Sequence, residues 1–335
     1  MALSVLLLAA CGAELPQQSE SANASVSTRP QGLASTNKVL ILSSTVTYGI
    51  NSVEAKAARS LGYTVEVVTD ATWSAKTSAD FATYRAIVLG DDTCNENKDR
   101  LKAAVANRHV WGSVVDGNVI IVGTDPVYHE VAQATASVIK FATDKAGKTG
   151  AYISLSCYYH STGTPTAVPL LEPFGAFTVT GVGMGCYDDA HIIATHTTLS
   201  ALTDKILSRW TCSVHEVFTA YPAANFTPFA IARDPLSTRL PFSRDFADGS
   251  HGVPYILARG VIPGSCGDGV VQSPEKCDTG ANNGVPGTAC ASVCQLNWCG
   301  DGVVDAGEEC DLGASNGSST CGASCKSVAS PPRFP

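Results

Sequence analysis

Short apolar runs alternate with amphipathic stretches along the chain from Lys38 onward. The runs are bounded by polar residues or glycine, as in the buried strands of a parallel sheet, and lie at 39–42, 64–68, 84–89, 118–122 and 151–155. The stretches between them have helical spacing, at 53–61, 98–107 and 129–145. This alternation predicts an α/β domain at 38–262, a doubly wound parallel sheet with helices on both faces. Two later segments, 229–232 and 254–258, are predicted to be strands at the sheet edge.

The chain begins with about eight apolar residues, too few to span a bilayer and typical of an export signal. The four residues that end at Cys11 have the form of a lipobox, so residues 1–11 resemble a bacterial lipoprotein signal. The resemblance implies a lipid on Cys11 and a place at the outer membrane or cell surface. Because no Lys or Arg precedes the apolar run, an ordinary signal and a secreted protein are the alternative. Residues 12–37 lack a hydrophobic period and are predicted to be a disordered tether.

The C-terminal part contains one cysteine-rich unit twice, at 266–298 and 299–325. An even number of cysteines at regular spacing predicts a disulfide framework, and the two copies together supply Cys266, Cys277, Cys290, Cys294, Cys299, Cys310, Cys321 and Cys325. A zinc site is the alternative, but these units contain no histidine. The units resemble the Myxococcus cysteine-rich repeat. That resemblance implies an exported protein with a stalk-like or adhesion-like module that has no assigned chemistry.

Carboxylates concentrate in the same units, which hold five Asp and three Glu against one Lys, a net charge of −7 out of −8 for the chain. Hard oxygen donors beside glycines also occur in calcium loops, and here the candidates are Asp268, Asp278, Asp301, Asp305 and Asp311. Solvated carboxylates without a cation are the simpler interpretation. No other cofactor is expected.

The overall composition limits the choice of partners. Only 16% of the 335 residues are charged, and the net charge is negative. Binding to nucleic acid needs a basic surface that neutralises phosphates, so a nucleic-acid partner is not expected. A membrane partner is expected only through the N-terminal lipid.

Polar residues follow the predicted strands at the sheet edge where ligands bind in such folds. Within this domain, the order and spacing of elements from about 38 to 235 resemble the class I glutamine amidotransferase-like superfamily. That resemblance implies a nucleophilic cysteine on the sharp turn after 118–122, where this chain has Gly123, Thr124, Asp125 and Pro126. This turn thus offers a threonine in place of the cysteine, and a threonine hydroxyl needs a strong dedicated base to act as a nucleophile. We therefore expect the amidotransferase-like domain to be catalytically inactive.

A rebuilt site is the alternative. Cys157 follows the strand 151–155 and stands three residues before His160, so a thiol–imidazole pair is conceivable. Thr124, Asp125 and His191 complete the set of candidate catalytic residues. A disulfide is the structural alternative for Cys157, because the domain has an even number of cysteines: Cys94, Cys157, Cys186 and Cys212. Among three connectivities we expect Cys157–Cys186 and Cys94–Cys212.

Two functional hypotheses follow. The first is an exported surface lipoprotein whose inactive domain binds or scaffolds an unidentified surface ligand or protein. The second is a secreted hydrolase or transferase with a rebuilt site near Cys157, His160 and Asp125. The feature that separates them is whether Cys157 is a free thiol within reach of a histidine.

Overall fold

The computed structural model describes residues 36–263, apart from 92, 95, 182–186, 235–241 and 247, together with 277–279, 282, 290, 308–310, 321, 322 and 325–327. Among these residues, no helix combines the length and the apolar character needed to cross a membrane. The predicted signal at 1–11, the tether and most of the cysteine-rich units lie outside the described residues.

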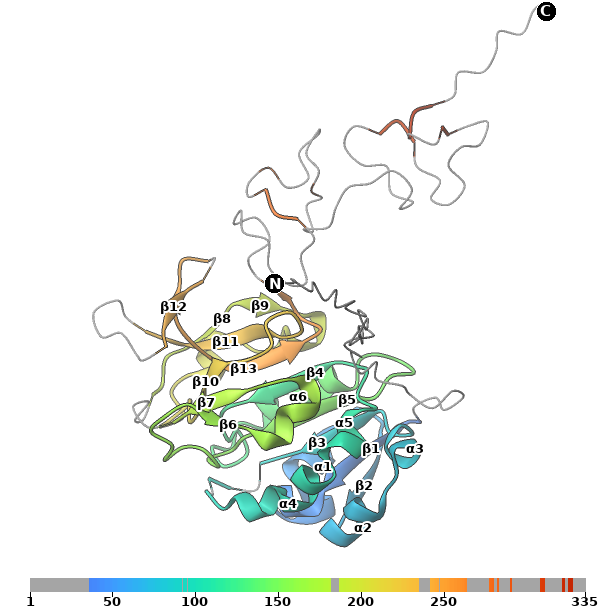
Figure 1. Ribbon diagram of the computed structural model, residues 1–335, viewed down its shortest axis with the longest axis vertical. Helices are drawn as coiled ribbons and strands as arrows, with labels where there is room; N and C mark the ends of the chain where they lie inside the picture. The colour runs from blue at the N-terminus through green and yellow to red at the C-terminus, as the bar shows by residue number, and fades with distance from the viewer. Residues whose placement is uncertain are drawn as a thin grey trace, which may run out of the picture.

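Five parallel strands form one half of the central sheet, in the order β2–β1–β3–β5–β4 (Figure 1). They are β1 (Lys38–Leu42), β2 (Thr64–Val68), β3 (Ala86–Leu89), β4 (Val119–Val122) and β5 (Gly150–Ser154). Strands β3, β4 and β5 are buried along their whole length, as their continuous apolar runs predict. All five strands predicted in this region are confirmed, with ends shifted by up to two residues.

The other half of the sheet is antiparallel. Strand β13 (His251–Arg259) pairs antiparallel with β4 and with β11 (Thr227–Arg233), and β8 (Ala190–Ile192) follows β11. The short strand β12 (Arg244–Asp245) also pairs with β13. The nine-stranded sheet is therefore mixed, and the prediction of a parallel sheet is wrong for this half. Strands β11 and β13 lie inside the sheet rather than at its edge, because an apolar run indicates burial but not strand direction or order.

Helices cover both faces of the parallel half. Val39 and Ile41 of β1 belong to one apolar core with α1 (Val53–Ser60) and α6 (Ala132–Ala142). Leu40 and Leu42 belong to the opposite core, which also holds residues of α2 (Asp70–Ala75), α3 (Ser78–Phe81), α4 (Lys102–Ala106) and α5 (Arg108–Gly112). This division follows from the alternation of side chains along a strand.

The remaining elements are short. Two small sheets comprise β10 (Val217–Ala220), β7 (Thr178–Thr180) and β6 (Thr166–Ala167), and β14 (Ile262–Pro263) with β9 (Ala194–Thr195). The other helical turns are η1 (Ser43–Thr45), η2 (Gly49–Asn51), η3 (Lys98–Leu101), η4 (Pro169–Phe174), η5 (Thr197–Leu199) and α7 (Asp204–Leu207). The helix predicted at 98–107 is thus divided between η3 and α4.

Disulfides join equivalent cysteines in the two cysteine-rich units. Cys277 is bonded to Cys290, and Cys310 is bonded to Cys321. Each bond connects the second and third cysteines of its unit, so both copies use the same pairing at this position. This confirms the predicted disulfide framework at four of its cysteines, and Cys325 is disulfide-bonded as well.

Candidate functional site

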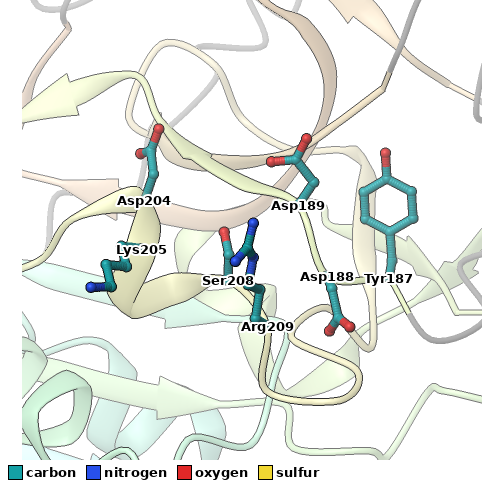
Figure 2. A pocket seen from close by; sticks show the side chains of 7 residues that line it. All are labelled: Tyr187, Asp188, Asp189, Asp204, Lys205, Ser208 and Arg209. Carbon is teal, nitrogen blue, oxygen red and sulfur yellow. The ribbon is translucent and has the colours of Figure 1, made fainter.

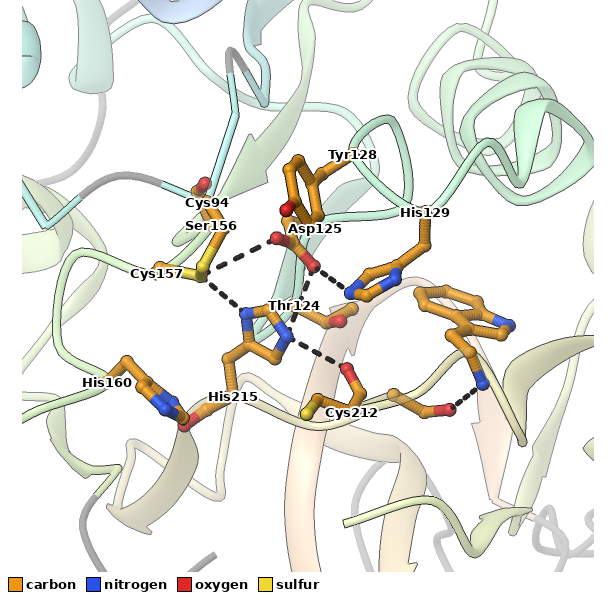
Figure 3. Close-up of polar contacts among 12 residues, drawn as sticks. Cys94, Thr124, Asp125, Tyr128, His129, Ser156, Cys157, His160, Cys212 and His215 are labelled. Atoms are coloured by element: carbon orange, nitrogen blue, oxygen red, sulfur yellow. Dashed lines mark hydrogen bonds and ion pairs between the residues drawn. A yellow bond between two sulfur atoms is a disulfide. The ribbon is translucent and has the colours of Figure 1, made fainter. Parts of the chain in front are cut away.

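Three segments meet beyond the carboxyl ends of β4 and β5 (Figure 3). Asp125 follows β4 by three residues, and Cys157 follows β5 by three residues. The third segment, which holds His215, reaches the site because the backbone N–H groups of His215 and Glu216 both donate to the carbonyl of Gly123, at 3.0 Å. Asp125 and Cys157 are fully buried, and His215 is 3% exposed. Backbone hydrogen bonds to Gly123 therefore fix the position of the His215 segment at this site.

A sharp turn places Cys157. The residue before it, Ser156, has a φ of 51°, a left-handed conformation that is uncommon for a residue other than glycine. Its Oγ lies 2.8 Å from Oδ1 of Asp91 and 2.7 Å from the carbonyl oxygen of Thr93. Asp91 in turn accepts a hydrogen bond from the backbone N–H of Val127, at 3.0 Å. A strained turn thus follows β5, whereas the amidotransferase-like resemblance implies such a turn after 118–122.

The sulfur of Cys157 is bonded to Cys94, which is exposed. Both predicted pairings, Cys157–Cys186 and Cys94–Cys212, are therefore wrong. Cys212 is disulfide-bonded as well. The sequence could not give this connectivity, because Cys94 and Cys157 follow β3 and β5, and these strands are neighbours only in the folded sheet. The Cys94–Cys157 bond joins an exposed residue to a buried one.

His215 lies directly against Cys157. Its Nδ1 is 2.7 Å from Sγ of Cys157, and its Nε2 is 2.8 Å from the carbonyl oxygen of Cys212. A carbonyl can only accept, so Nε2 carries the proton and Nδ1 presents its lone pair to the sulfur. Burial, and then the neighbouring His160, lower the pKa of His215 to about 4. The ring is consequently neutral at neutral pH while the disulfide is intact.

Asp125 is the second polar group at the sulfur. Its Oδ2 lies 3.5 Å from Sγ of Cys157. Its Oδ1 lies 3.2 Å from Nε2 of both His129 and His215, yet it accepts no hydrogen bond of good geometry. Burial, and then the nearby Asp91, raise the pKa of Asp125 to about 9. The carboxyl group is therefore protonated at neutral pH.

A hollow of about 430 Å³ opens onto these side chains. Three histidines meet there, with the ring centroids of His129 and His160 at 5.6 and 5.4 Å from that of His215. The complete lining comprises Cys94, Tyr128, His129, His160, Thr211, Cys212 and His215. A small molecule in this hollow would contact Cys94 and the imidazole of His215.

A larger hollow, of about 770 Å³, is lined by Tyr187, Asp188, Asp189, Asp204, Lys205, Ser208 and Arg209 (Figure 2). It contains no pair of nucleophile and base. Asp188 connects it with the site, because its Oδ1 accepts hydrogen bonds from the backbone N–H of Cys212 and Ser213, at 2.8 and 3.0 Å. These bonds hold a strained segment in place, since Thr211 and Cys212 have φ values of 62° and 84°.

The structure brings together most of the predicted site residues. His160 lines the hollow, and the fully buried Cys157 and Asp125 lie against His215, which also lines it. The carbonyl of Thr124 accepts a hydrogen bond from Oγ of Ser154. His191 lies elsewhere, between Asp204 and Asp248 at 2.6 and 2.8 Å, so its prediction as a member of this site is wrong.

Sequence reasoning missed His215 and His129. The available signal in the sequence was a pair of polar residues, His215 and Glu216, directly before the apolar start of β10. Both residues are buried in the structure. Among the described residues, Cys94, Asp125, Cys157 and His215 are the ones whose donor atoms lie close enough to hold one metal ion. Of the predicted calcium ligands, Asp278 is nearly buried, and Asp268, Asp301, Asp305 and Asp311 lie outside the described residues, as does Cys11.

The buried carboxyl groups predict a pH dependence of stability. The pKa of Asp125 is raised to about 9, and burial raises that of Glu54 to about 7, so the folded protein keeps protons that the unfolded chain releases near pH 4. Stability should therefore fall as pH rises through these windows. His215, with its lowered pKa, opposes this trend only below about pH 6.5. We expect the free energy of unfolding, measured in urea without reductant, to decrease from pH 6.5 to 9.

The matched variant is Asp125→Asn, whose amide has the shape of the protonated acid but cannot ionise. It should flatten the slope by up to about 1.4 kcal/mol per pH unit between pH 6.5 and 9. Asp99→Asn, at an exposed position, should leave the slope unchanged. An Asp125→Asn protein with the slope of the wild type would contradict a protonated Asp125.

Comparisons with known proteins give no relative. No protein-family model, no curated protein and no solved structure matches this chain.

Proposed function

We propose that the α/β domain is a thiol enzyme, a hydrolase or acyl transferase, whose nucleophile is Cys157 after reduction of the Cys94–Cys157 bond. The observation that carries this proposal is the 2.7 Å distance between Nδ1 of His215 and Sγ of Cys157. A sulfur in a disulfide has no proton to donate, whereas a thiol at this position would donate one to the lone pair of Nδ1. The contact therefore has the geometry of an activated thiol and its base.

The chemistry would follow from this pair. His215 takes the thiol proton, and the sulfur attacks a carbonyl carbon, forming an S–C bond while the carbonyl π electrons move to oxygen. When the carbonyl re-forms, the leaving group departs with the proton from His215, and water or another acceptor then takes the acyl group from sulfur. The hydrogen bond to the carbonyl of Cys212 keeps the ring in the required tautomer. A thiolate beside Nδ1 would also favour the protonated ring, against the effect of burial.

The disulfide would act as a gate for this reaction. An external thiolate can attack the sulfur of Cys94, the exposed residue of the pair, and Cys157 then leaves with the bonding electrons as a thiolate. A second thiolate releases Cys94, so one dithiol is oxidised and one disulfide is reduced. The protonated Asp125, at 3.5 Å, can supply the proton to the leaving sulfur.

This proposal changes the preference between the two hypotheses from the sequence. The interpretation of an inactive amidotransferase-like domain depended on a turn after 118–122 that lacks a cysteine. That turn still lacks a cysteine, but a strained turn at Ser156 precedes Cys157 at the end of a central parallel strand, which supports a nucleophile at this other position. The amidotransferase-like arrangement of the parallel half remains part of the proposal.

A second candidate is an exported surface lipoprotein that binds or scaffolds an unidentified ligand or protein. The disulfide itself favours it, because a permanent Cys94–Cys157 bond would leave no thiol. The paired cysteines of the C-terminal units support export to an oxidising compartment for either candidate. Anchoring through Cys11 is part of the same proposal.

The test uses the full chain and p-nitrophenyl acetate, an activated ester that acetylates reactive thiols. After reduction, we expect Cys157 to gain one acetyl group faster than any other cysteine of the same molecule, and then to lose it to water. Peptide mass mapping with and without reductant gives both rates. A reduced Cys157 that reacts no faster than the other cysteines would contradict the enzyme and favour the binding protein.

A further inference from the structure

Four potential metal ligands converge at the carboxyl ends of the central strands. One donor atom each of Cys94, Cys157, His215 and Asp125 lies within 4.8 Å of those of the other three. In a tetrahedral zinc site, bonds of about 2.0–2.3 Å bring neighbouring donor atoms about 3.3–3.8 Å apart. The 3.5 Å between Cys157 Sγ and Asp125 Oδ2 already has this value. Once the two sulfurs are no longer bonded to each other, shifts of about an ångström would complete the tetrahedron.

His215 is oriented as a ligand. Its Nε2–H is donated to the carbonyl of Cys212, at 2.8 Å, so the lone pair of Nδ1 faces the sulfurs. Histidines that bind metals almost always donate their other ring N–H to a carbonyl or carboxylate in this way. The ring therefore needs neither a flip nor a change of tautomer to bind a cation.

Asp125 supplies an independent indication. It is fully buried, and its Oδ1 accepts no hydrogen bond of good geometry. Buried polar atoms are nearly always satisfied, and one that is not requires an explanation. Oδ2 is the oxygen that faces Cys157, so a cation at this position satisfies Oδ1 only when the carboxylate binds it through both oxygens.

We propose that the reduced protein binds one divalent metal ion of the zinc class through Cys94, Cys157, His215 and Asp125. Two thiolates and an imidazole are ligands for zinc-like ions, not for calcium or magnesium. Binding releases the protons of both thiols and of the Asp125 carboxyl group, and leaves oxidation states unchanged. The metal and the disulfide exclude each other, because they use the same two sulfurs. The hollow of about 430 Å³ provides the entry path.

The inference does not require Cys157 to be catalytic, but it requires the same reduced pair. A metal ion at this site would also occupy the proposed nucleophile. The site would then have three states, of which the disulfide and the metal complex protect Cys157, and only the free thiol reacts.

The full chain is reduced with a phosphine, which is then removed under nitrogen, and the reduced protein is titrated with Co²⁺. The charge-transfer absorption of cobalt reports thiolate ligands, and its d–d absorption reports tetrahedral geometry. The wild type should bind one equivalent more than His215→Ala, in which affinity at this site should fall by more than about 100-fold. Every cysteine is present in both proteins, so cobalt bound by the C-terminal cysteines cancels in the difference spectrum. His109→Gln, at an exposed position outside the hollow, should behave as the wild type.

Identical cobalt spectra and affinities for the wild type and His215→Ala would overturn the metal site. Cys94→Ser separates this result from the proposed function, because it loses a metal ligand but keeps Cys157 and His215. It should therefore bind cobalt weakly while still being acetylated at Cys157. Strong cobalt binding by the wild type together with no selective acetylation in Cys94→Ser would support the metal site and contradict the enzyme.

Discussion

The Cys94→Ser protein should be acetylated at Cys157 by p-nitrophenyl acetate without any reductant, whereas Cys157→Ser should react at this position at least about 10³-fold more slowly. Either substitution removes the same disulfide, which closes a loop with a sequence separation of 63. Loop entropy alone assigns that bond about 4 kcal/mol, and both variants lose it equally. The two proteins therefore lose the same disulfide, and they differ in whether residue 157, which is buried, carries a thiol or a hydroxyl.

Reaction at residue 157 and the melting temperature of each protein decide the outcome. Equal melting temperatures with acetylation only in Cys94→Ser would assign the nucleophile to Cys157. If neither variant is acetylated there while both remain folded, the thiol has no special reactivity. The disulfide is then structural.

Gly123→Ala should lower the free energy of unfolding by about 3 kcal/mol. This loss corresponds to a decrease in Tm of about 6–12 °C. A Cβ at Gly123 would lie 2.1 Å from the carbonyl oxygen of Glu216 and 3.0 Å from that of Tyr255. Both neighbours are backbone atoms of buried segments, so they cannot rotate away as a side chain could. The same carbonyl of Gly123 accepts from His215 and Glu216, so the substitution should also displace His215 from Cys157.

Gly147→Ala is the matched control. Gly147 has a φ of 73° and no atom within 4 Å of an added Cβ, so alanine there costs only its left-handed backbone, about 1 kcal/mol. Thermal unfolding of the two variants compares a steric clash with a conformational cost. Equal losses of Tm in Gly123→Ala and Gly147→Ala would mean that the contact between β4 and the His215 segment is not tight.

The parallel half of the fold could be predicted from the sequence because its signal is local. A continuous apolar run such as 118–122 specifies a strand buried on both faces, and the carboxyl ends of parallel strands lie at one edge. Thr124, Asp125 and Cys157 could therefore be placed near one another. The direction of β11 and β13 could not be predicted, because Ile231 and Ile256 have the same apolar character in either orientation.

The rest of the site depends on contacts that are distant in the sequence. His215 is 58 residues from Cys157 and reaches it through the hydrogen bond of its backbone to Gly123. Cys94 meets Cys157 only because β3 and β5 are adjacent. Cysteine spacing does not contain this information, and for that reason the predicted connectivity was wrong.

The most direct test of the central claim is the pH dependence of alkylation of Cys157 by iodoacetamide in the Cys94→Ser protein. Burial raises the pKa of a thiol, and a neighbouring imidazolium that takes up its proton lowers it, so the midpoint of the rate profile shows which effect is larger. The contact with His215 predicts a midpoint at least about one unit below the value of about 8.5 for an ordinary thiol. A midpoint at or above 8.5 would mean that His215 does not activate Cys157, and the proposed thiol enzyme would be contradicted.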